Sequence, residues 1–426
     1  MLKRHITILF FLFFHVALFA QVDSTLNKRL DFARSYIEVG GSCSPSFTGK
    51  KLTANGTTSF DHSASVIPYI NWGAFHFWGH AEFYVSFPVG QLLLESNEDA
   101  GYDLSHSTVT GARILPWAYE PKKIRPYVGA AWSASAFKQT INPDTDQPIL
   151  AKDFNLVPEA GLVYGSDKLS FRLGAKYYSN TEWDYALSKT EFTTIHTPKL
   201  NLQFGILYSY EGSRKVKKET QNRWNSYERT SRIGAATSKM GDFFIGAGPS
   251  NSFSLNKSQY NKSMLPYLND KQVSNVYVDI SAGYQFHKPG MFAAVSYRNP
   301  KFKKEGYGSS QQIEKTAIAL EAVKYFKDYT GFVPYVGLNA SYDKLVYTES
   351  SDNGEISVTK EGLEPGITFG WDIVPGKTDE AFILRTNLRW YPLSEFEVNG
   401  KTFQFSQLEY NLIQAVFYPG RRKSKK

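Results

Sequence analysis

The sequence holds a single cysteine, Cys43, in 426 residues, so no disulfide can form within the chain. It also lacks, after residue 20, any apolar run close to the roughly 20 residues that a membrane-spanning helix needs. These absences exclude a disulfide-stapled secreted domain and a helical membrane protein. They leave a transmembrane β-barrel open, because barrel strands alternate apolar and polar residues and produce no long apolar run.

A basic patch of the kind that binds nucleic acid is missing as well. The net charge is +8, but residues 213–240 hold eight Lys and Arg against two Glu, and the tail 421–426 holds five basic residues. The rest of the chain is therefore slightly acidic. Nucleic-acid binding needs basic residues gathered on one folded surface, so we expect no nucleic-acid partner.

The first 20 residues predict a secretory signal peptide. Lys3 and Arg4 precede an apolar stretch at residues 6–19, and the small residue Ala20 suits cleavage before Gln21. The stretch is too short and wrongly flanked for a spanning helix. Cys43 lies too far from this core to be a lipidated first residue. We therefore expect an exported protein.

What the chain does have is a period of two, repeated along its length, together with 15% aromatic residues. Aromatic residues at this level suit the girdles of a membrane barrel. Alternation of apolar and polar residues indicates β-strands with two different faces. We predict sixteen strands, at residues 35–47, 62–72, 79–91, 105–119, 124–138, 152–165, 168–181, 196–211, 241–254, 273–287, 291–302, 312–326, 331–347, 356–373, 380–393 and 404–419.

The predicted connections alternate in length. Those after the second, fourth and sixth strands are short, as in GSDK. Those after the odd-numbered strands are longer and polar, as in TGKKLTANGTTSFDH (48–62). Short turns at one end and long loops at the other are typical of a transmembrane barrel.

The two halves of the chain are copies of each other. RPYVGAAWSAS (125–135) aligns with VPYVGLNASYD (333–343), and LNLQFGILYSYEG (200–212) aligns with LEYNLIQAVFYPG (408–420). The sequence thus predicts an all-β, antiparallel transmembrane β-barrel fold of sixteen strands from an internal duplication. Its parts are a signal peptide (1–20), a first repeat (35–212), a basic periplasmic linker (213–240), a second repeat (241–420) and a basic tail (421–426).

Charged residues recur at alternate positions among apolar ones. The pattern Glu-x-Gly-[Leu/Ile]-x-[Tyr/Phe]-Gly occurs at 159–165 and 364–370, each time followed by a strand with two bases. Since strand side chains alternate between faces, the apolar residues point to lipid and the charges point inward. We predict interior ion pairs of Glu159 with Arg172 or Lys176, and of Glu364 with Arg385 or Arg389, with Arg113 and Glu321 as further inward charges. The alternative is a water-filled lumen whose charges tune ion selectivity.

Each half resembles the small eight-stranded outer membrane β-barrel family, the OmpA/OmpX-like domains. The residues that carry the resemblance are 159–165 with their partner strand, and the closing strand with Gln203, Gly205, Tyr208 and Tyr210. In that family the closing strand is read by the barrel-insertion machinery. The second copy departs from the pattern, because Ile413 replaces the glycine.

Sixteen strands can close as two eight-stranded barrels or as one sixteen-stranded barrel. Small inward residues and internal acid–base pairs favour two barrels, which their own side chains would fill, whereas sixteen strands leave an aqueous channel. We expect a protein of the cell outer membrane of a diderm (Gram-negative) bacterium. Its expected role is structural or binding, with long extracellular loops. Its expected partners are outer-membrane lipid, the insertion machinery and an envelope protein.

Two other functions stay open. The first is a porin-like diffusion channel built from all sixteen strands. The second is an outer-membrane enzyme with a loop-rim active site, because Asp61, His62, Asp103 and His106 fall near predicted long loops. No zinc-type cluster, Gly-x-Ser-x-Gly elbow or nucleotide-binding loop occurs. We therefore expect no enzyme activity, no cofactor and no metal.

Overall fold

This computed structural model describes residues 33–53, 55–76, 79–94, 102–140, 146–151, 155–166, 168–179, 181–211, 240–326, 331–352, 354–374 and 381–421. The predicted signal peptide, nearly all of the predicted linker and the tail beyond residue 421 lie outside the described residues. In the part of the chain that is described, no helix is both long and apolar enough to cross a membrane.

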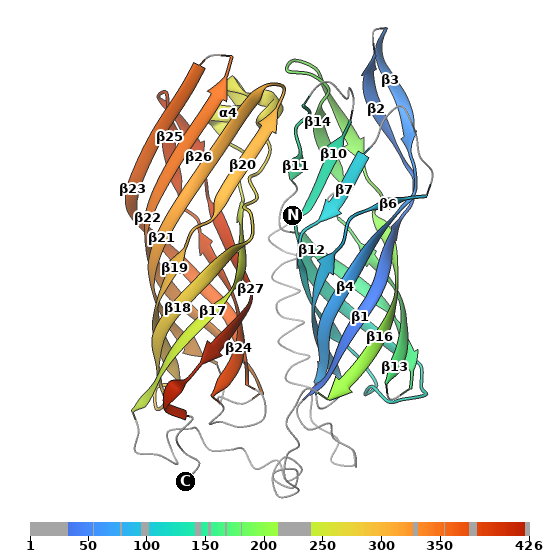
Figure 1. Cartoon of the computed structure of the whole chain (residues 1–426), viewed down its shortest axis with the longest axis vertical. Coiled ribbons are helices and arrows are strands. Elements are labelled where there is room, and N and C mark those ends of the chain that lie inside the picture. The colour runs from blue at the N-terminus through green and yellow to red at the C-terminus, as the bar shows by residue number, and fades with distance from the viewer. Residues whose placement is uncertain are drawn as a thin grey trace, which may run out of the picture.

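The first half forms a closed barrel, which we call barrel 1 (Figure 1). Its first strand pairs on one side with the second barrel strand and on the other side with the last, so the sheet has no open edge. All neighbouring strands are antiparallel. In chain order the eight strands are β1 (Ala33–Ser44), β4 (Ser65–His76), β5 (Ala81–Pro88), β8 (Val109–Ile114), β9 (Arg125–Ser133), β12 (Asn155–Gly165), β13 (Leu169–Tyr177) and β16 (Leu200–Glu211).

The second half closes in the same way as barrel 2, because its first strand pairs with its own last strand. The prediction of sixteen strands in two barrels is therefore confirmed, and the single sixteen-stranded barrel is wrong. The strands are β17 (Gly241–Ser254), β18 (Tyr277–Phe286), β19 (Met291–Arg298), β21 (Ser309–Tyr325), β22 (Gly331–Ser351), β23 (Gly354–Val374), β24 (Phe382–Tyr391) and β27 (Gln407–Phe417).

The alternation in the sequence becomes two faces in the structure. On β13, Phe171 and Leu173 are exposed on the outside, while Arg172 and Lys176 are buried inside. Glycines sit where the lumen is most crowded. A Cβ on Gly161 or Gly174 would overlap the Tyr127 hydroxyl, so these positions on β12 and β13 leave space for that ring.

The long connections are largely folded, which corrects the expectation of plain loops. Residues 48–62, predicted as a connection, form most of a hairpin that continues β1 and β4 beyond the barrel wall. We call the elements at this end the extensions (top of Figure 1). They are β2 (Phe47–Thr53), β3 (Gly56–His62), β6 (Leu92–Leu93), β7 (Tyr102–His106), β10 (Ser135–Gln139), β11 (Leu150–Ala151), β14 (Glu182–Ala186), β15 (Phe192–His196), α4 (Gln259–Met264), η1 (Pro266–Leu268), β20 (Lys301–Gly306), β25 (Glu395–Val398) and β26 (Lys401–Gln404).

Each extension has its own apolar core. In barrel 1 it contains Phe137, Trp183 and Tyr185, which join β10 to the β14–β15 hairpin. In barrel 2 it contains Tyr260 of α4, Tyr347 of β22 and residues of the β25–β26 hairpin. A buried aromatic core makes each extension a packed unit rather than a set of independent loops. The opposite end, with the short turns, also carries η2 (Pro419–Arg421) after the last strand.

Candidate functional site

The lumen of barrel 1 is filled by a balanced set of buried charges. The Arg113 guanidinium donates hydrogen bonds to Glu82, at 2.9 Å, and to Glu159, at 3.1 Å. The Arg172 guanidinium donates to Glu38 at 2.6 Å and to Glu82 at 2.7 Å. Arg113 thus bonds to the neighbouring strand β5 and, past β9, to β12, whereas both bonds of Arg172 reach strands that are not its neighbours. These bonds link the strands across the lumen.

Tyrosine hydroxyls complete this network. Those of Tyr36, Tyr69 and Tyr84 donate hydrogen bonds to the carboxylates of Glu82, Glu38 and Glu159 respectively. Lys176, opposite Glu159 in the strand register, lies with its ammonium 5.8 Å from the centre of the Tyr84 ring. Buried charges are tolerated when they are paired and hydrogen-bonded in this way.

The structure places all eight sequence-predicted residues in barrel interiors but corrects the pairing. Glu159 pairs with Arg113 of β8 rather than with Arg172. In the strand register Arg172 lies opposite Val163, four residues along β12 from Glu159, and its guanidinium contacts Glu38 and Glu82 instead. The partners of Arg172, Glu38 and Glu82, were not singled out from the sequence. Each of them alternates with apolar residues in its strand, which is the same pattern that led to Glu159.

Barrel 2 holds its charges at successive levels along the lumen. Toward the short turns, Arg385 donates to Asp372 at 2.7 Å. In the middle, Arg389 contacts Asp279 at 2.5 Å and Glu321 at 2.8 Å. This corrects the predicted pairing of both arginines with Glu364.

A third level in barrel 2 lies nearer the extensions. Lys315 contacts Asp343 at 2.7 Å and Glu409 at 2.9 Å, and Arg298 also pairs with Glu409. The side chain of Glu364 contacts Lys360 at 2.7 Å. Thus each level contributes its own cation and carboxylates, and the lumen is filled along its length.

The Glu-x-Gly pattern itself does not mark equivalent positions. In barrel 1, Glu159 lies opposite Lys176 in the strand register. In barrel 2, Thr368 lies opposite Arg389. When Lys176 of β13 is aligned with Arg389 of β24, the residue that corresponds to Glu159 is Thr368. Glu364 lies four residues before Thr368. The repeated charges are a shared type of interior, not a residue-by-residue copy.

The short-turn end of barrel 2 is closed by a further polar cluster. The Arg421 guanidinium donates to Asp242 at 2.8 Å and to Gln285 at 2.7 Å. The ring of His287 lies 3.0 Å from the same Asp242 carboxylate. The first residue of the predicted basic tail is thus part of the fold. Ile413, where the second copy departs from the closing-strand pattern, lies at a β-bulge that shifts the register of β27 against both neighbours.

The outer surfaces are apolar at the level of these charges. Leu173 on β13 is 61% exposed and Leu320 on β21 is 61% exposed, although both strands point buried charges inward. On β21 the outward residues become polar toward the extension, at Glu314 and Gln312. A closed sheet with an apolar outside and a polar inside is stable only with lipid around it. The chain is a tandem pair of eight-stranded outer-membrane β-barrels.

The tandem barrels contact each other through part of this outer surface. The Trp132 ring of β9 lies 5.6 Å from the Trp371 ring of β23 and 6.3 Å from the Tyr410 ring of β27, measured between ring centres. Ala134 joins a buried cluster with residues of β24 and β27. Tyr410 is 1% exposed, unlike most outward residues, because the other barrel replaces lipid there.

The extensions of the two barrels also meet. The Tyr307 backbone N–H donates to the Asp146 carbonyl oxygen at 2.5 Å, and its hydroxyl donates to the Ala186 carbonyl oxygen at 2.8 Å. Lys189 of barrel 1 pairs with Asp352 of barrel 2. These contacts join the two extensions into one continuous surface.

The residues considered for a loop-rim active site are not brought together as a catalytic group. His62 is buried among aromatic rings, 4.5 Å from the centres of both Phe47 and Tyr102, and burial lowers the pKa of His62 to about 4. His106 hydrogen-bonds the Ser135 hydroxyl at 2.8 Å, and burial lowers its pKa to about 4 as well. Asp61 accepts a hydrogen bond from Thr48.

No arrangement for a metal is present either within the described ranges. No three His, Cys, Asp or Glu side chains there lie close enough together to hold an ion. The buried carboxylates of the lumens are each engaged by arginine, lysine or tyrosine instead. The lumen charges therefore act on each other.

Comparisons with known proteins find likeness in structure only. No family model matches the sequence, and no curated protein does. Neisserial surface protein A matches with 15% identity and a TM-score of 0.30, over 41% of this chain and 96% of its own. Ail of Yersinia pestis matches with 13% identity and a TM-score of 0.29, over 42% of this chain and 99% of its own. The transport unit of the Escherichia coli autotransporter AIDA-I matches with 9% identity and a TM-score of 0.21, over 94% of this chain and 93% of its own. The assignment above rests on the strand pairing and the two faces, not on these low scores.

Proposed function

We propose that this outer-membrane protein is a non-conducting platform that presents its joined extensions outside the cell and binds a protein partner there. The observation that carries the proposal is the filling of both lumens by buried ion pairs. Arg113 and Arg389 are each 1% exposed in the middle of their barrels. Side chains that line a water-filled channel would be accessible to water, and these are not.

The filled lumen agrees with the strand number. Eight strands enclose a space just wide enough for side chains, whereas an aqueous channel needs about twice as many. The diffusion channel considered from the sequence required all sixteen strands in one wall, and β16 does not pair with β17. Aromatic cores in the extensions lie above the charged levels and add a second closure.

A binding role is supported by how the extensions are built. They are packed around their own apolar cores and bonded to each other. A partner that binds such a surface loses little free energy in ordering loops, because the surface is already organised. We assign this end to the cell exterior, because outer-membrane barrels carry their long connections outside and their short turns in the periplasm.

We propose no enzymatic role. A general base must reach a reacting group, and the rings of His62 and His106 are held inside the extension by aromatic and hydroxyl neighbours. His106 does contact the Ser135 hydroxyl, but its other ring nitrogen has no hydrogen-bond partner among the described residues, so no carboxylate orients the ring as a catalytic triad requires.

Two measurements test the proposal with the full-length protein. In planar bilayers we expect no stable openings of porin size, and such openings would contradict it. In the native membrane, a photo-crosslinking residue at the exposed Ser59 of β3 should give a defined protein adduct. The matched control at Leu173 should give only lipid adducts. Absence of any protein adduct from Ser59 and from other exposed extension positions would contradict the binding role.

A further inference from the structure

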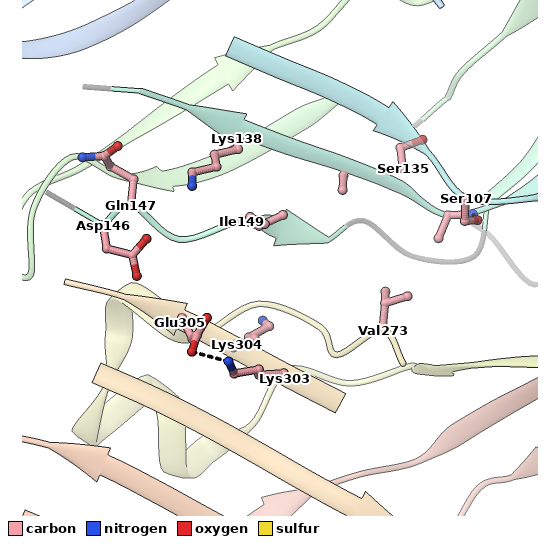
Figure 2. Close-up of a pocket in the computed structure, with 12 residues that line it drawn as sticks. Ser107, Ser135, Lys138, Asp146, Gln147, Ile149, Val273, Lys303, Lys304 and Glu305 are labelled. Carbon is pink, nitrogen blue, oxygen red and sulfur yellow. Dashed lines mark hydrogen bonds and ion pairs between the residues drawn. The ribbon is translucent and has the colours of Figure 1, made fainter. Parts of the chain in front are cut away.

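A cavity of about 290 Å³ lies where the two extensions meet. Figure 2 shows strand β10 and residues 146–149 of barrel 1 on one side, with β20 of barrel 2 on the other. The volume is at the lower end of the range for ligand pockets. It has room for a few residues of an extended chain and excludes a folded domain.

The edge of β20 faces this cavity. β20 pairs with β21 on one side, and on the other side only its first two residues have strand contacts. There the Asn275 N–H donates to the Lys301 carbonyl oxygen at 2.9 Å, and the Lys301 N–H donates to Asn275 Oδ1 at 3.0 Å. The backbone groups of Lys301 therefore point away from β21.

Backbone groups in a strand alternate in direction with a period of two residues. Lys303 and Glu305 have the same parity as Lys301, so their N–H and C=O groups also point away from β21. Tyr307 continues the series, and its N–H donates across the gap to the Asp146 carbonyl oxygen of barrel 1. This bond shows that the free edge of β20 is directed at the other barrel.

The edge remains open between these two contacts. Within the described residues, the backbone groups of Lys303 and Glu305 on this side have no protein partner. An open strand edge with regularly spaced donors and acceptors is a template for adding another strand. In this protein the open edge of β20 lies in the cavity, between the Asn275–Lys301 and Tyr307–Asp146 hydrogen bonds. Only a narrow, extended chain can reach it there.

The opposite wall suits such a chain. It carries the small side chains of Ala134, Ala136 and Ser135, which allow a backbone to approach closely. Lys138 extends toward the cavity from β10 (Figure 2). The side chains of Lys303 and Glu305 pair with each other at 2.5 Å, and the Lys304 ammonium donates to the Leu268 carbonyl oxygen. Lys138 is therefore the lining cation left to meet an acidic group, in a cavity that the Asp146 carboxylate also lines.

We propose that this cavity binds an extended peptide segment of a partner protein, which adds to β20 as a strand. Its backbone bonds to Lys303 and Glu305, and an acidic side chain of the peptide faces Lys138. This inference rests on the proposed function, since it names the chemistry of the partner and the place where it binds. Backbone pairing supplies the affinity in this mode and the side-chain pockets supply the choice of sequence.

The test uses the full-length protein in lipid nanodiscs and a phage-displayed library of random eight-residue peptides. Selected peptides are synthesised with a fluorescent label, and binding is measured by anisotropy. Lys303→Pro removes one edge donor, and proline is tolerated on a strand edge where its N–H would face outward. Lys303→Ala is the matched control, because it removes the side chain and keeps the donor. Ala136→Trp fills the cavity from the other wall.

We expect Lys303→Pro and Ala136→Trp each to weaken binding about tenfold or more, and Lys303→Ala to change it by less than about threefold. Folding of each variant is checked by its heat-modifiable migration in gels, and Ala136→Trp decides the matter if Lys303→Pro does not fold. Selection of no peptide, or equal loss in Lys303→Ala and Lys303→Pro, overturns the inference. If peptides bind but ignore both cavity variants, the binding platform stands and this site falls.

Discussion

The Arg172 guanidinium donates a hydrogen bond of 2.6 Å to the Glu38 carboxylate across the lumen of barrel 1. Strand β16 lies between the two strands that carry these residues, so the bond is a brace inside the barrel rather than a contact between neighbours. The same guanidinium also holds Glu82.

Removal of this brace should be costly. Arg172→Met leaves Glu38 and Glu82 buried without their shared cation, and we expect the free energy of unfolding to fall by about 3–5 kcal/mol. The measurement is urea titration of the full-length protein in lipid vesicles. The triple variant with Glu38→Gln and Glu82→Gln should recover much of the loss, because it removes the uncompensated charges. A loss below about 1 kcal/mol for Arg172→Met would contradict a dry, paired lumen.

The apolar outer face can be tested on one strand. Leu320 and Gln312 point outward from β21, but Leu320 lies at the level of the lumen charges and Gln312 lies toward the extension. Leu320→Arg should lower the free energy of unfolding in vesicles by about 2–4 kcal/mol, because it places a charge in lipid. Gln312→Arg is the matched control and should change it by less than about 1 kcal/mol. Similar effects of both substitutions would mean that the lipid boundary is misplaced.

The buried imidazole of His62 should make the extension of barrel 1 sensitive to acid. Its pKa is lowered to about 4 by burial, whereas in the unfolded hairpin a histidine titrates near pH 6.5. The unfolded state therefore takes up the proton first, and stability falls as the pH drops from 6.5 toward 4. At pH 5 the expected loss is about 2 kcal/mol relative to pH 7.

Hydrogen exchange of β2 and β3 at pH 7 and pH 5, corrected for intrinsic rates, measures this loss. His62→Phe should remove this contribution, because phenylalanine fits the aromatic surroundings and does not titrate, whereas a contribution from His106, whose pKa is also lowered to about 4 by burial, should stay. The control is His196→Phe, since His196 is exposed on β15 and its loss should leave the acid effect in place. An unchanged acid effect in His62→Phe would assign it to another group.

The contact between the barrels predicts that they stay together without a covalent link. With a protease site inserted in residues 213–240, the cleaved wild-type halves should co-purify in mild detergent. Trp132→Ala removes the ring that contacts Trp371 and Tyr410 and should let them separate. The control is Trp390→Ala, because Trp390 is on the outer face and 40% exposed. Separation of the wild-type halves would show that the contact is too weak to join the barrels.

The sequence was sufficient to predict the barrel strands and which of their residues face inward. It was insufficient to predict which inward charges pair and which outward residues meet the other barrel. The period of two located every barrel strand, because lipid and lumen impose opposite demands on successive side chains. It could not pair Arg172 with Glu38, since that bond crosses the lumen and depends on curvature. Nor could it distinguish outward residues that meet lipid from outward residues that meet the other barrel, such as Trp132.

The extensions were missed for a different reason. Away from lipid their strands need no apolar outer face, so the alternation that marked the barrel strands is weaker there. One local indication was present in the sequence. Asn399 and Gly400 join β25 to β26 with positive φ values of 49° and 70°, and an Asn-Gly pair between apolar stretches is a strong hairpin pattern.

Closure of each half on itself is tested most directly by a disulfide between β1 and β16. Val39 and Ile206 are paired in the register and both point outward. In a Cys43→Ser background, Val39→Cys with Ile206→Cys should oxidise to a disulfide, found by mass spectrometry of the digested protein. Tyr208→Cys with Ile245→Cys, which joins β16 to β17, should not. A disulfide in the second pair and none in the first would mean one large barrel, and would contradict two separate, filled ones.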